Sequence, residues 1–275
     1  MSDSRAPPRP STDAGHVLVT GASSGIGAAI AREYARRGKP LILTARREDR
    51  LLALANELES RVPCTVLAAD LSEPSVPAAI FDQVEELGLH VDTLVNNAGY
   101  GVTGHYLAQP WETHAQFLQV LVNAPCELTH LFLPSMQERR HGRILNVASL
   151  AGLVPGSAGH TLYGAAKSFL IKFSQSLALE NAPLGVNVCA LCPGFTYSEF
   201  HDVTGTRDLV SKMPGRMWMK SEDVARMGVD AVERGQIVCI TGRLNRSIKT
   251  LFKLLPDGLG LRTMQKRAKD FRNAE

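Results

Sequence analysis

Tyr163 and Lys167 lie four residues apart in the segment TLYGAAK, which we expect to be helical. At that spacing the two side chains share one face of a helix, one turn apart. A free tyrosine has a pKa of about 10, and a fixed neighbouring cation lowers that pKa by favouring the phenolate. The pair is therefore predicted to transfer a proton near neutral pH. The alternative is an exposed pair without a function, because the same spacing also occurs by chance.

Ser149 is a further candidate catalytic residue. It ends the segment HGRILNVAS, an apolar run typical of a strand, and it precedes Tyr163 by fourteen residues. Its hydroxyl can hydrogen-bond a substrate oxygen beside the tyrosine if the intervening loop folds back. Taken alone, Ser149 could be an ordinary serine, so a catalytic role for it depends on the residues that surround it.

A glycine-rich turn stands near the start of the chain. The run HVLVT at 16–20 predicts a strand, GASSGIG follows at 21–27, and AAIAREYARRG predicts a helix. This arrangement presents backbone N–H groups and a helix N-terminus to a pyrophosphate, and glycine permits close backbone approach. A tight turn without a ligand is the alternative. The candidate dinucleotide-binding residues are Gly21, Ser23, Ser24, Gly25, Ile26 and Gly27.

The residues after the next predicted strand, 41–44, indicate which dinucleotide binds. An acidic residue there would accept from a ribose 2′-hydroxyl, whereas an arginine can hold a 2′-phosphate. The chain has Arg46 and Arg47 at this point, so we expect NADP, with Arg46 as the better candidate. Both arginines could instead be solvated charges before a helix, neutralised by Glu48 and Asp49.

Polar turns follow three further predicted strands. Asp70 comes after TVLAA, Asn97 after VDTLVN, and Pro193-Gly194 after VNVCAL and a cysteine. The Asp70 carboxylate could accept from the adenine amino group or cap the following helix. Asn97 is expected mainly to brace the sheet edge and the bound nucleotide. Pro193-Gly194 opens an irregular stretch that we expect to extend to about Lys220.

The alternation of strands and helices predicts an α/β fold. We expect a Rossmann-type, doubly wound parallel sheet in three α/β/α layers, which forms a single domain with ligands beyond the carboxyl ends of its strands. Residues 1–14 are polar and rich in proline, and they predict a disordered arm. Residues 15–242 would form the Rossmann-type oxidoreductase domain, and 243–275 a basic helical extension.

Five motifs, in matching order and spacing, resemble the short-chain dehydrogenase/reductase family across residues 16–240. The resemblance implies a Rossmann fold and hydride transfer between a nicotinamide and a carbonyl or alcohol. It implies that Tyr163 gives or takes the proton, Lys167 lowers its pKa and holds the nicotinamide ribose, and Ser149 positions the substrate oxygen. Homo-oligomers are common in this family. The motifs are Thr20-Gly21-x-x-x-Gly25-x-Gly27, Asn96-Asn97-Ala98-Gly99, Ser149, Tyr163-x-x-x-Lys167 and Pro193-Gly194.

One position departs from the family pattern. Members usually have an asparagine in the helix between the Asn-Asn-Ala-Gly turn and the serine strand, where it helps to hold a water that links the lysine to solvent. Counting places Leu121 there, and Asn123 lies about 200° further around a helix. A bulge near Pro125 would be needed to bring Asn123 inward. We hypothesise that Ser149, Tyr163 and Lys167 suffice without this asparagine.

Large apolar residues mark the irregular stretch after Gly194. The family uses this region as a mobile lid over the substrate, so we expect an apolar ketone, aldehyde or secondary alcohol. Methionine adapts to irregular shapes, which fits a tolerant pocket. The same residues could instead pack against the domain or a partner subunit. They are Phe195, Tyr197, Phe200, Met213, Met217, Trp218 and Met219.

Composition predicts a soluble protein of the cytoplasm. The chain has 275 residues, 44% of them hydrophobic, and no segment apolar enough to span a bilayer. Its five cysteines are scattered through apolar runs, which favours free thiols in a reducing compartment. Cys189 and Cys192 fit Cys-x-x-Cys, but on a strand residues three apart point to opposite faces, so we expect no metal site there.

The C-terminal segment carries the positive charge of the chain. Residues 243–275 contain nine Lys/Arg and three Asp/Glu, a net charge of +6, against +3 for the whole chain. Its apolar residues recur at helical spacing before Pro256, which predicts a basic amphipathic helix. Such a helix could lie on an anionic membrane or cover its own domain or a dimer mate. Nucleic-acid binding is not expected, because few aromatics are interleaved. The apolar residues are Leu244, Ile248, Leu251, Phe252 and Leu255.

Two classes of function follow from these patterns. The first is an NADPH-dependent carbonyl reductase, or the same enzyme acting as an alcohol dehydrogenase. The second is a catalytically weak NADP-binding regulatory or scaffold protein of the same fold, which Leu121 and the unusual tail suggest. The presence of Ser149, Tyr163 and Lys167 together favours the enzyme.

Overall fold

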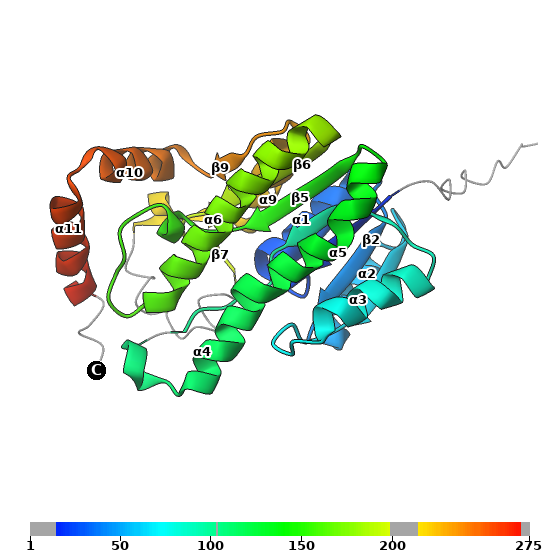
Figure 1. Cartoon of the computed structure of the whole chain (residues 1–275), viewed down its shortest axis with the longest axis horizontal. Coiled ribbons are helices and arrows are strands. Elements are labelled where there is room, and N and C mark those ends of the chain that lie inside the picture. The colour runs from blue at the N-terminus through cyan, green and yellow to red at the C-terminus, as the bar shows by residue number, and fades with distance from the viewer. Residues whose placement is uncertain (1–14, 103, 199–213, 271–275) are drawn as a thin grey trace, which may run out of the picture.

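The structure is a computed structural model that describes residues 15–102, 104–198 and 214–270, with side chains described as far as residue 265. The predicted disordered arm, residues 1–14, lies outside the described residues. The remainder confirms a single α/β domain with three layers, in which helices cover both faces of one sheet (Figure 1).

Seven parallel strands form the central sheet. Their apolar runs, such as VLV and LIL, suit strands that are buried on both faces. Six of them lie where the sequence predicts strands, and the short last strand is an addition. In spatial order they are β3 (Cys64–Ala68), β2 (Leu41–Ala45), β1 (His16–Thr20), β4 (Val91–Asn96), β5 (Gly142–Val147), β6 (Val186–Cys192) and β9 (Val238–Ile240).

Alternate residues of each strand point to opposite faces of the sheet and belong to two separate apolar cores. Val17 and Leu145 belong to a core shared with one set of helices, whereas Leu18 and Ile144 belong to the core on the other face. The first set is α1 (Gly25–Arg36), α2 (Glu48–Leu58) and α9 (Ser221–Glu233). The second set is α3 (Val76–Glu86), α4 (Trp111–Leu118), α5 (Ala124–Glu138) and α6 (Thr161–Asn181).

The cysteine pair on β6 is split between these layers. Cys189 is buried in the core shared with α1 and α9, and Cys192 in a small cluster with Leu170 and Ile171 of α6. Both are free thiols, as are the other three cysteines. Across the described ranges, no group of side chains has the composition and arrangement of a metal site.

The order of strands reverses direction between β1 and β4. From β1 the chain builds outward through β2 to β3, and it then returns to place β4 on the other side of β1. A crevice forms at such a switch point beyond the carboxyl ends of the strands, and ligands of doubly wound sheets bind there. The glycine-rich turn follows β1 and the Asn-Asn turn follows β4, so both lie at this point.

The segment after β6 is only partly irregular. Thr196–Tyr197 (β7) pairs with Met219–Lys220 (β8) in a two-stranded parallel sheet, which the sequence did not predict. Residues 199–213 lie outside the described residues, and with them Phe200 and Met213. The helix expected after Asp70 begins only at Val76, after a series of turns.

Two helices end the chain. The predicted amphipathic helix is confirmed as α10 (Arg243–Leu254), and α11 (Asp257–Asp270) follows it at a sharp angle (Figure 1). The division of the chain at residue 242 stays a prediction. Among the residues that the structure describes, no helix is both long and apolar enough to cross a bilayer.

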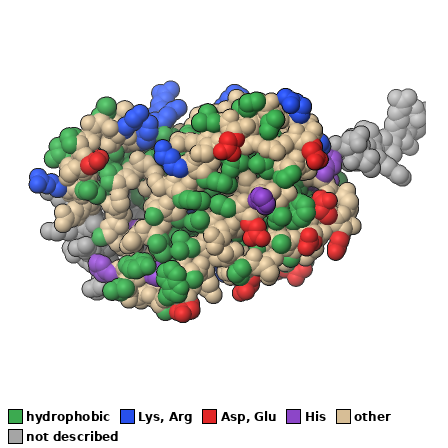
Figure 2. Space-filling view, viewed as in Figure 1, with side chains coloured by type: hydrophobic (Ala, Val, Ile, Leu, Met, Phe, Trp, Pro, Cys, Tyr) green, Lys and Arg blue, Asp and Glu red, His purple; other side chains and the backbone are tan. Residues whose placement is uncertain are grey.

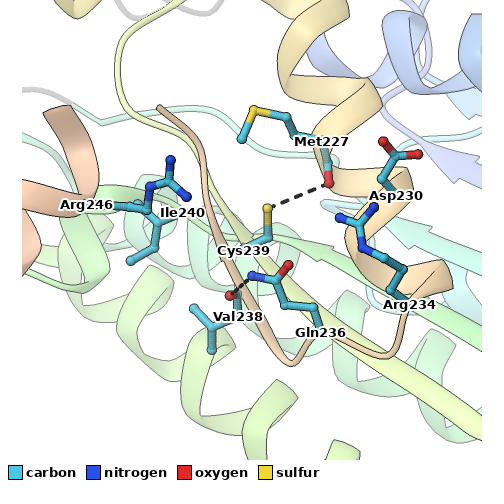
Figure 3. Close-up of a pocket in the computed structure, with 8 residues that line it drawn as sticks. All are labelled: Met227, Asp230, Arg234, Gln236, Val238, Cys239, Ile240 and Arg246. Atoms are coloured by element: carbon cyan, nitrogen blue, oxygen red, sulfur yellow. Dashed lines mark hydrogen bonds between the residues drawn. The ribbon is translucent and has the colours of Figure 1, made fainter. Parts of the chain in front are cut away.

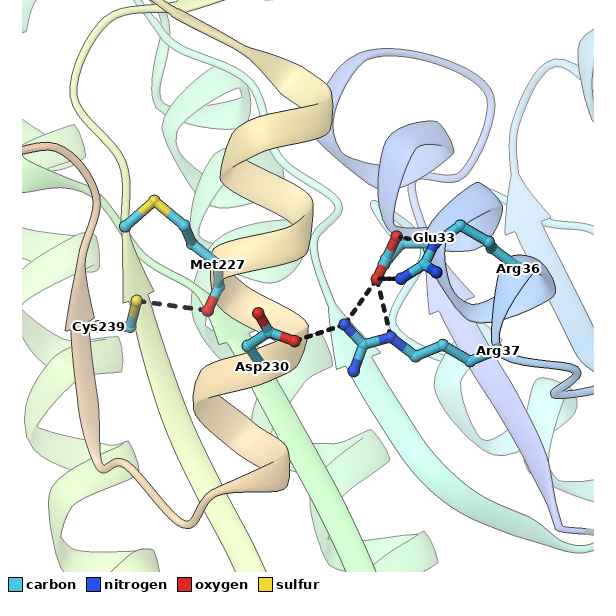
Figure 4. Close-up of polar contacts among 6 residues, drawn as sticks. All are labelled: Glu33, Arg36, Arg37, Met227, Asp230 and Cys239. Carbon is cyan, nitrogen blue, oxygen red and sulfur yellow. Dashed lines mark hydrogen bonds and ion pairs between the residues drawn. The ribbon is translucent and has the colours of Figure 1, made fainter.

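An ion-pair network joins α1 to α9 (Figure 4). Arg37 donates to Glu33 at 2.6 Å and to Asp230 at 2.5 Å, and Arg36 donates to Glu33 at 2.7 Å. The hydrogen bond from Arg36 is the main cause that lowers the pKa of Glu33 to about 2, with Arg37 acting in the same direction against burial. Glu33 is 11% exposed, so its pairing is poorly screened by water.

Replacing Glu33 by Gln is expected to destabilise the protein above pH 5 by about 1–2 kcal/mol. The folded-state pKa of Glu33 lies below its unfolded value of 4.5, so its contribution is present at neutral pH and is lost as pH falls toward 2. Urea unfolding at pH 7 and at pH 3 measures this difference. The matched control is Glu57→Gln, because the Arg32–Glu57 pair is 45% and 49% exposed and should contribute little. Equal effects of the two substitutions would contradict the expectation.

Candidate active site

Ser149 and Tyr163 come together as the sequence predicts. Ser149 follows β5, and its hydroxyl accepts from the Ala151 backbone N–H at 3.1 Å, which starts a 3₁₀ turn and folds the loop back. Leu150 N–H donates to the Pro193 carbonyl at 2.8 Å and ties this loop to the end of β6. Tyr163 lies in the first turn of α6, where its phenol is hydrogen-bonded with the Ser149 hydroxyl.

Lys167 lies one turn further along α6 and points into the protein. It is 5% exposed, and its Nζ donates to the Val147 carbonyl at the end of β5 over 2.7 Å. The same Nζ lies 5.8 Å from the centroid of the Tyr163 ring. The spacing of four residues therefore gives the shared helix face that the sequence predicts.

Burial has the largest effect on the pKa values of Lys167 and Tyr163. It lowers the pKa of Lys167 to about 8. It also raises the pKa of Tyr163 above its ordinary value, and the hydrogen bond with Ser149 only opposes that rise. That Lys167 lowers the pKa of Tyr163 stays a prediction, because burial and the Ser149 hydrogen bond are the causes that act on this phenol here. The phenol thus keeps its proton at neutral pH.

Leu121 occupies the position where the family pattern has asparagine. It is 1% exposed. A Cβ placed on Gly99 would lie 3.6 Å from the Leu121 side chain and 3.8 Å from the Lys167 Nζ, so both residues border Gly99. A π-helical turn, Gln119–Asn123, does precede Pro125, whose missing N–H breaks the α-helical pattern. This bulge does not bring Asn123 inward, because Asn123 is exposed and its amide donates to Gln119 at 2.9 Å.

The glycine turn after β1 is held against the Asn-Asn turn after β4. Gly21 and Gly25 have φ of 65° and 56°, which favours glycine. A Cβ on Gly27 would collide with the Asn97 amide and the Gly21 carbonyl. Asn97 Nδ2 donates to the Thr20 carbonyl at 2.9 Å and the Gly21 carbonyl at 3.2 Å. Asn97 therefore braces this turn, and the backbone N–H groups of Ser23, Ser24 and Ile26 belong to the same turn.

Both arginines after β2 lie beside candidate nucleotide residues. Arg47 donates to the hydroxyls of Ser23 and Ser24 at 3.1 and 3.0 Å. Arg46 is 64% exposed and lies 4.0 Å from the Asp70 carboxylate, which accepts from Ser72 N–H at 3.0 Å. The sequence favoured Arg46, but Arg47 is the arginine that reaches the glycine turn.

Gly194 has a packing role that sequence reasoning missed. A Cβ at this position would collide with the side chain of Asn245, which is 4% exposed and belongs to the first turn of α10. Asn245 in turn donates to the Thr241 carbonyl at 2.7 Å. The C-terminal helices therefore begin directly beside the Pro193-Gly194 turn, and no local pattern links positions so far apart in the sequence.

Three aromatic rings gather after this turn, and Trp218 stacks on Tyr197 while it is tilted against Phe195. The centroid of Trp218 lies 5.5 Å from that of Phe195 and 4.9 Å from that of Tyr197. Tyr197 is 54% exposed, so the stack presents an aromatic surface. Ser198 follows directly, and its Cβ lies close to Gly25 of the glycine turn.

A separate pocket of about 250 Å³ lies between α9, β9 and α10 (Figure 3). Arg234 and Arg246 line it, and the thiol of Cys239 points to the Met227 carbonyl at its side. None of the residues that the sequence predicts for the site lines this pocket, so it is distinct from the cluster of Ser149, Tyr163 and Lys167.

Replacing Lys167 by Met is expected to stabilise the protein at pH 7 by about 1–3 kcal/mol. The folded pKa of about 8 lies below the model-peptide value of 10.5, so the folded state holds the charged form at a cost. Between these two values the unfolded state binds more protons, and the unfolding free energy of the natural protein rises with pH. Urea unfolding should show the advantage of Lys167→Met shrinking from pH 7 to pH 10. Lys172→Met, an exposed change on α6, is the control, and an advantage that does not depend on pH would contradict the expectation.

Comparison with known proteins places this geometry in a family. The family model for short chain dehydrogenases matches residues 15–208. Sulfoacetaldehyde reductase of Chromohalobacter salexigens is 37% identical over 189 residues, 67% of this chain and 73% of the relative. A short-chain dehydrogenase from Sphingobium yanoikuyae in complex with NADPH superposes with a TM-score of 0.76 at 32% identity, over 88% of this chain and 96% of that one.

A second similar structure is the bulky-bulky ketone specific alcohol dehydrogenase from Comamonas testosteroni. It gives a TM-score of 0.72 at 28% identity and covers 88% of this chain and 95% of its own. Sequence, fold and site geometry thus agree. The chain belongs to the short-chain dehydrogenase/reductase family and is an oxidoreductase that uses a nicotinamide cofactor.

Proposed function

We propose that the protein is an NADP(H)-dependent reductase that acts on an apolar ketone or aldehyde, or on the corresponding secondary alcohol in reverse. The observation that carries the proposal is the hydrogen-bonded pair of Ser149 and Tyr163 beside the buried Lys167. Transfer of a hydride to a carbonyl develops negative charge on oxygen, and a positioned acid lowers that barrier. A phenol that keeps its proton at pH 7 suits the direction of reduction.

The chain offers a fitting set of groups for the cofactor, which supplies the hydride. A Cβ on Gly21 or Gly27 would prevent the turn from packing on Asn97, and α1 begins within this turn at Gly25, so its N-terminus could receive the pyrophosphate. Arg46 and Arg47 would hold the 2′-phosphate, Asp70 the adenine, and Lys167 the nicotinamide ribose. Pro193 and Gly194 would lie beside the nicotinamide, and Asn97 would brace the turn. These are the residues that we assign to cofactor binding.

The substrate oxygen would accept hydrogen bonds from Tyr163 and Ser149. Tyr163 would donate its proton to that oxygen, and Ser149 would hold it in place. The adjoining rings of Phe195, Trp218 and Tyr197 support an apolar substrate, because an exposed aromatic surface favours flat apolar groups. One similar structure is named for bulky ketones and one relative for sulfoacetaldehyde, so the family supports substrates of both kinds.

A second candidate function is an NADP-binding regulatory or scaffold protein with weak turnover. The observation that favours it is the apolar Leu121 beside Lys167, where a water-holding asparagine is the family pattern. The intact contacts of Ser149, Tyr163 and Lys167 favour the enzyme. We further propose that the protein is cytoplasmic and a homo-oligomer, as its family commonly is.

Replacing Tyr163 by Phe is expected to lower kcat at least a hundredfold, because the proton donor to the carbonyl oxygen is lost. NADPH oxidation over a panel of apolar ketones and aldehydes measures this, and NADPH fluorescence measures binding, which should change little. Tyr106→Phe is the matched control, since Tyr106 is 42% exposed and its ring stacks on that of His114.

Two outcomes bear on these alternatives, one against the reductase and one against the hypothesis that Ser149, Tyr163 and Lys167 suffice. One is tight NADPH binding by the natural protein with no turnover anywhere on the panel, which favours the scaffold function. The other is a hundredfold gain in turnover from Leu121→Asn on a good substrate, which would show that Ser149, Tyr163 and Lys167 do not suffice.

Replacing Arg46 or Arg47 by Ala is expected to reduce the preference for NADPH over NADH about tenfold or more, because each removes a charge-assisted contact with the 2′-phosphate. Steady-state kcat/KM with each cofactor gives the preference, and the value for NADH should stay nearly constant. Arg61→Ala, an exposed arginine beyond α2, is the control. If neither Arg46→Ala nor Arg47→Ala changed the ratio, the assignment of NADP would be wrong.

A further inference from the structure

Different kinds of residue lie on the different sides of α10. Helical spacing places Asn245, Ile248, Lys249 and Phe252 on the side that faces the domain, and they are buried or half-buried. The opposite side carries two kinds of exposed residue. Leu244, Leu251 and Leu254, at 40%, 57% and 77% exposure, lie on one half of it. Arg243, Arg246 and Lys253 lie on the other half.

The exposed leucines of α10 do not pack against the protein's own domain. Within the described residues of α10, Asn245 alone is fully buried, and the helix is attached through its contact with Gly194. The next helix, α11, is attached where Gly260 approaches Pro155 and Phe252. Two more leucines on α11, Leu259 and Leu261, are 50% and 54% exposed. Exposed leucines concentrated on two adjoining helices indicate a contact surface.

The net charge of the C-terminal segment indicates which kind of partner would bind it. Residues 243–275 carry a net charge of +6, whereas the rest of the chain is negative overall. Figure 2 shows Lys and Arg side chains beside hydrophobic ones over α10 and α11, and most Asp and Glu side chains of this face toward the other end. Arg246 also lines the pocket of Figure 3, together with Arg234, which directly follows α9, and with Asp230.

We propose that α10 and α11 bind the surface of an anionic phospholipid membrane. The leucines would enter the boundary between headgroups and acyl chains, and the lysines and arginines would contact the phosphates. A symmetric contact between two copies would bring the same positive charges face to face, which opposes it. The exposure of both leucines and basic residues on one helix side fits a flat negative surface, which accepts both at once.

Co-sedimentation of the full-length protein with vesicles tests this surface. We expect binding to vesicles of equal parts phosphatidylcholine and phosphatidylglycerol, little binding to phosphatidylcholine alone, and release by salt. The double variants Leu251→Gln/Leu254→Gln and Arg246→Glu/Lys253→Glu should each lower the bound fraction about tenfold or more. Leu87→Gln and Arg61→Glu are matched controls on the other end of the domain, and they should bind as the natural protein does.

Other outcomes overturn the proposal. Equal binding to both vesicle types, or equal binding of the double variants and the controls, would show that α10 does not recognise anionic lipid. If the leucine variant changed the mass in sedimentation velocity without vesicles, and no protein bound vesicles, the surface would be an interface between copies. The readout needs no NADPH turnover, so it is independent of the proposed reductase function.

Discussion

A lysine ammonium withdrawn from water is the constraint on which the site depends. The Nζ of Lys167 donates to the Val147 carbonyl at the end of β5, and burial lowers the pKa of Lys167 to about 8. Such a group can be kept only by a framework rigid enough to hold it, because a buried charge favours any movement that returns it to solvent. The strand end and the first turns of α6 supply that framework, and the core of both elements is closely packed on one sheet.

The second requirement is a fixed seam between β1 and β4. The Thr20 hydroxyl donates to the Val95 carbonyl at 3.1 Å and accepts from the N–H groups of Asn97 and Ala98 at 2.9 and 3.0 Å. One buried side chain thus joins two strand ends whose turns would flank the cofactor. Asn96 continues this polar row to Asn146 on β5 at 2.9 Å. The cofactor residues and the catalytic candidates are in this way positioned by a single set of strand ends.

The strands could be predicted because parallel strands buried on both faces appear as short apolar runs, and six such runs became β1 to β6. The pairing of Ser149 with Tyr163 followed from spacing once the fold was known. Three features could not be predicted. Strand β9 is only three residues long, the reach of Arg47 depends on its rotamer, and the packing of Asn245 on Gly194 joins segments distant in sequence. The bulge before Pro125 was foreseen as an alternative, but the side chain that it turns inward is Leu121.

The contact between Gly194 and Asn245 also has a consequence for how this protein could diversify. Any side chain larger than hydrogen at 194 would collide with the side chain of Asn245, so a change at 194 requires that side chain to move or to be replaced. A C-terminal segment exchanged with that of another family member would therefore be accepted only if its second or third residue left room for the turn after β6. Evolution of the tail is thereby coupled to the Pro193-Gly194 turn after β6, even though the tail contributes no candidate catalytic residue.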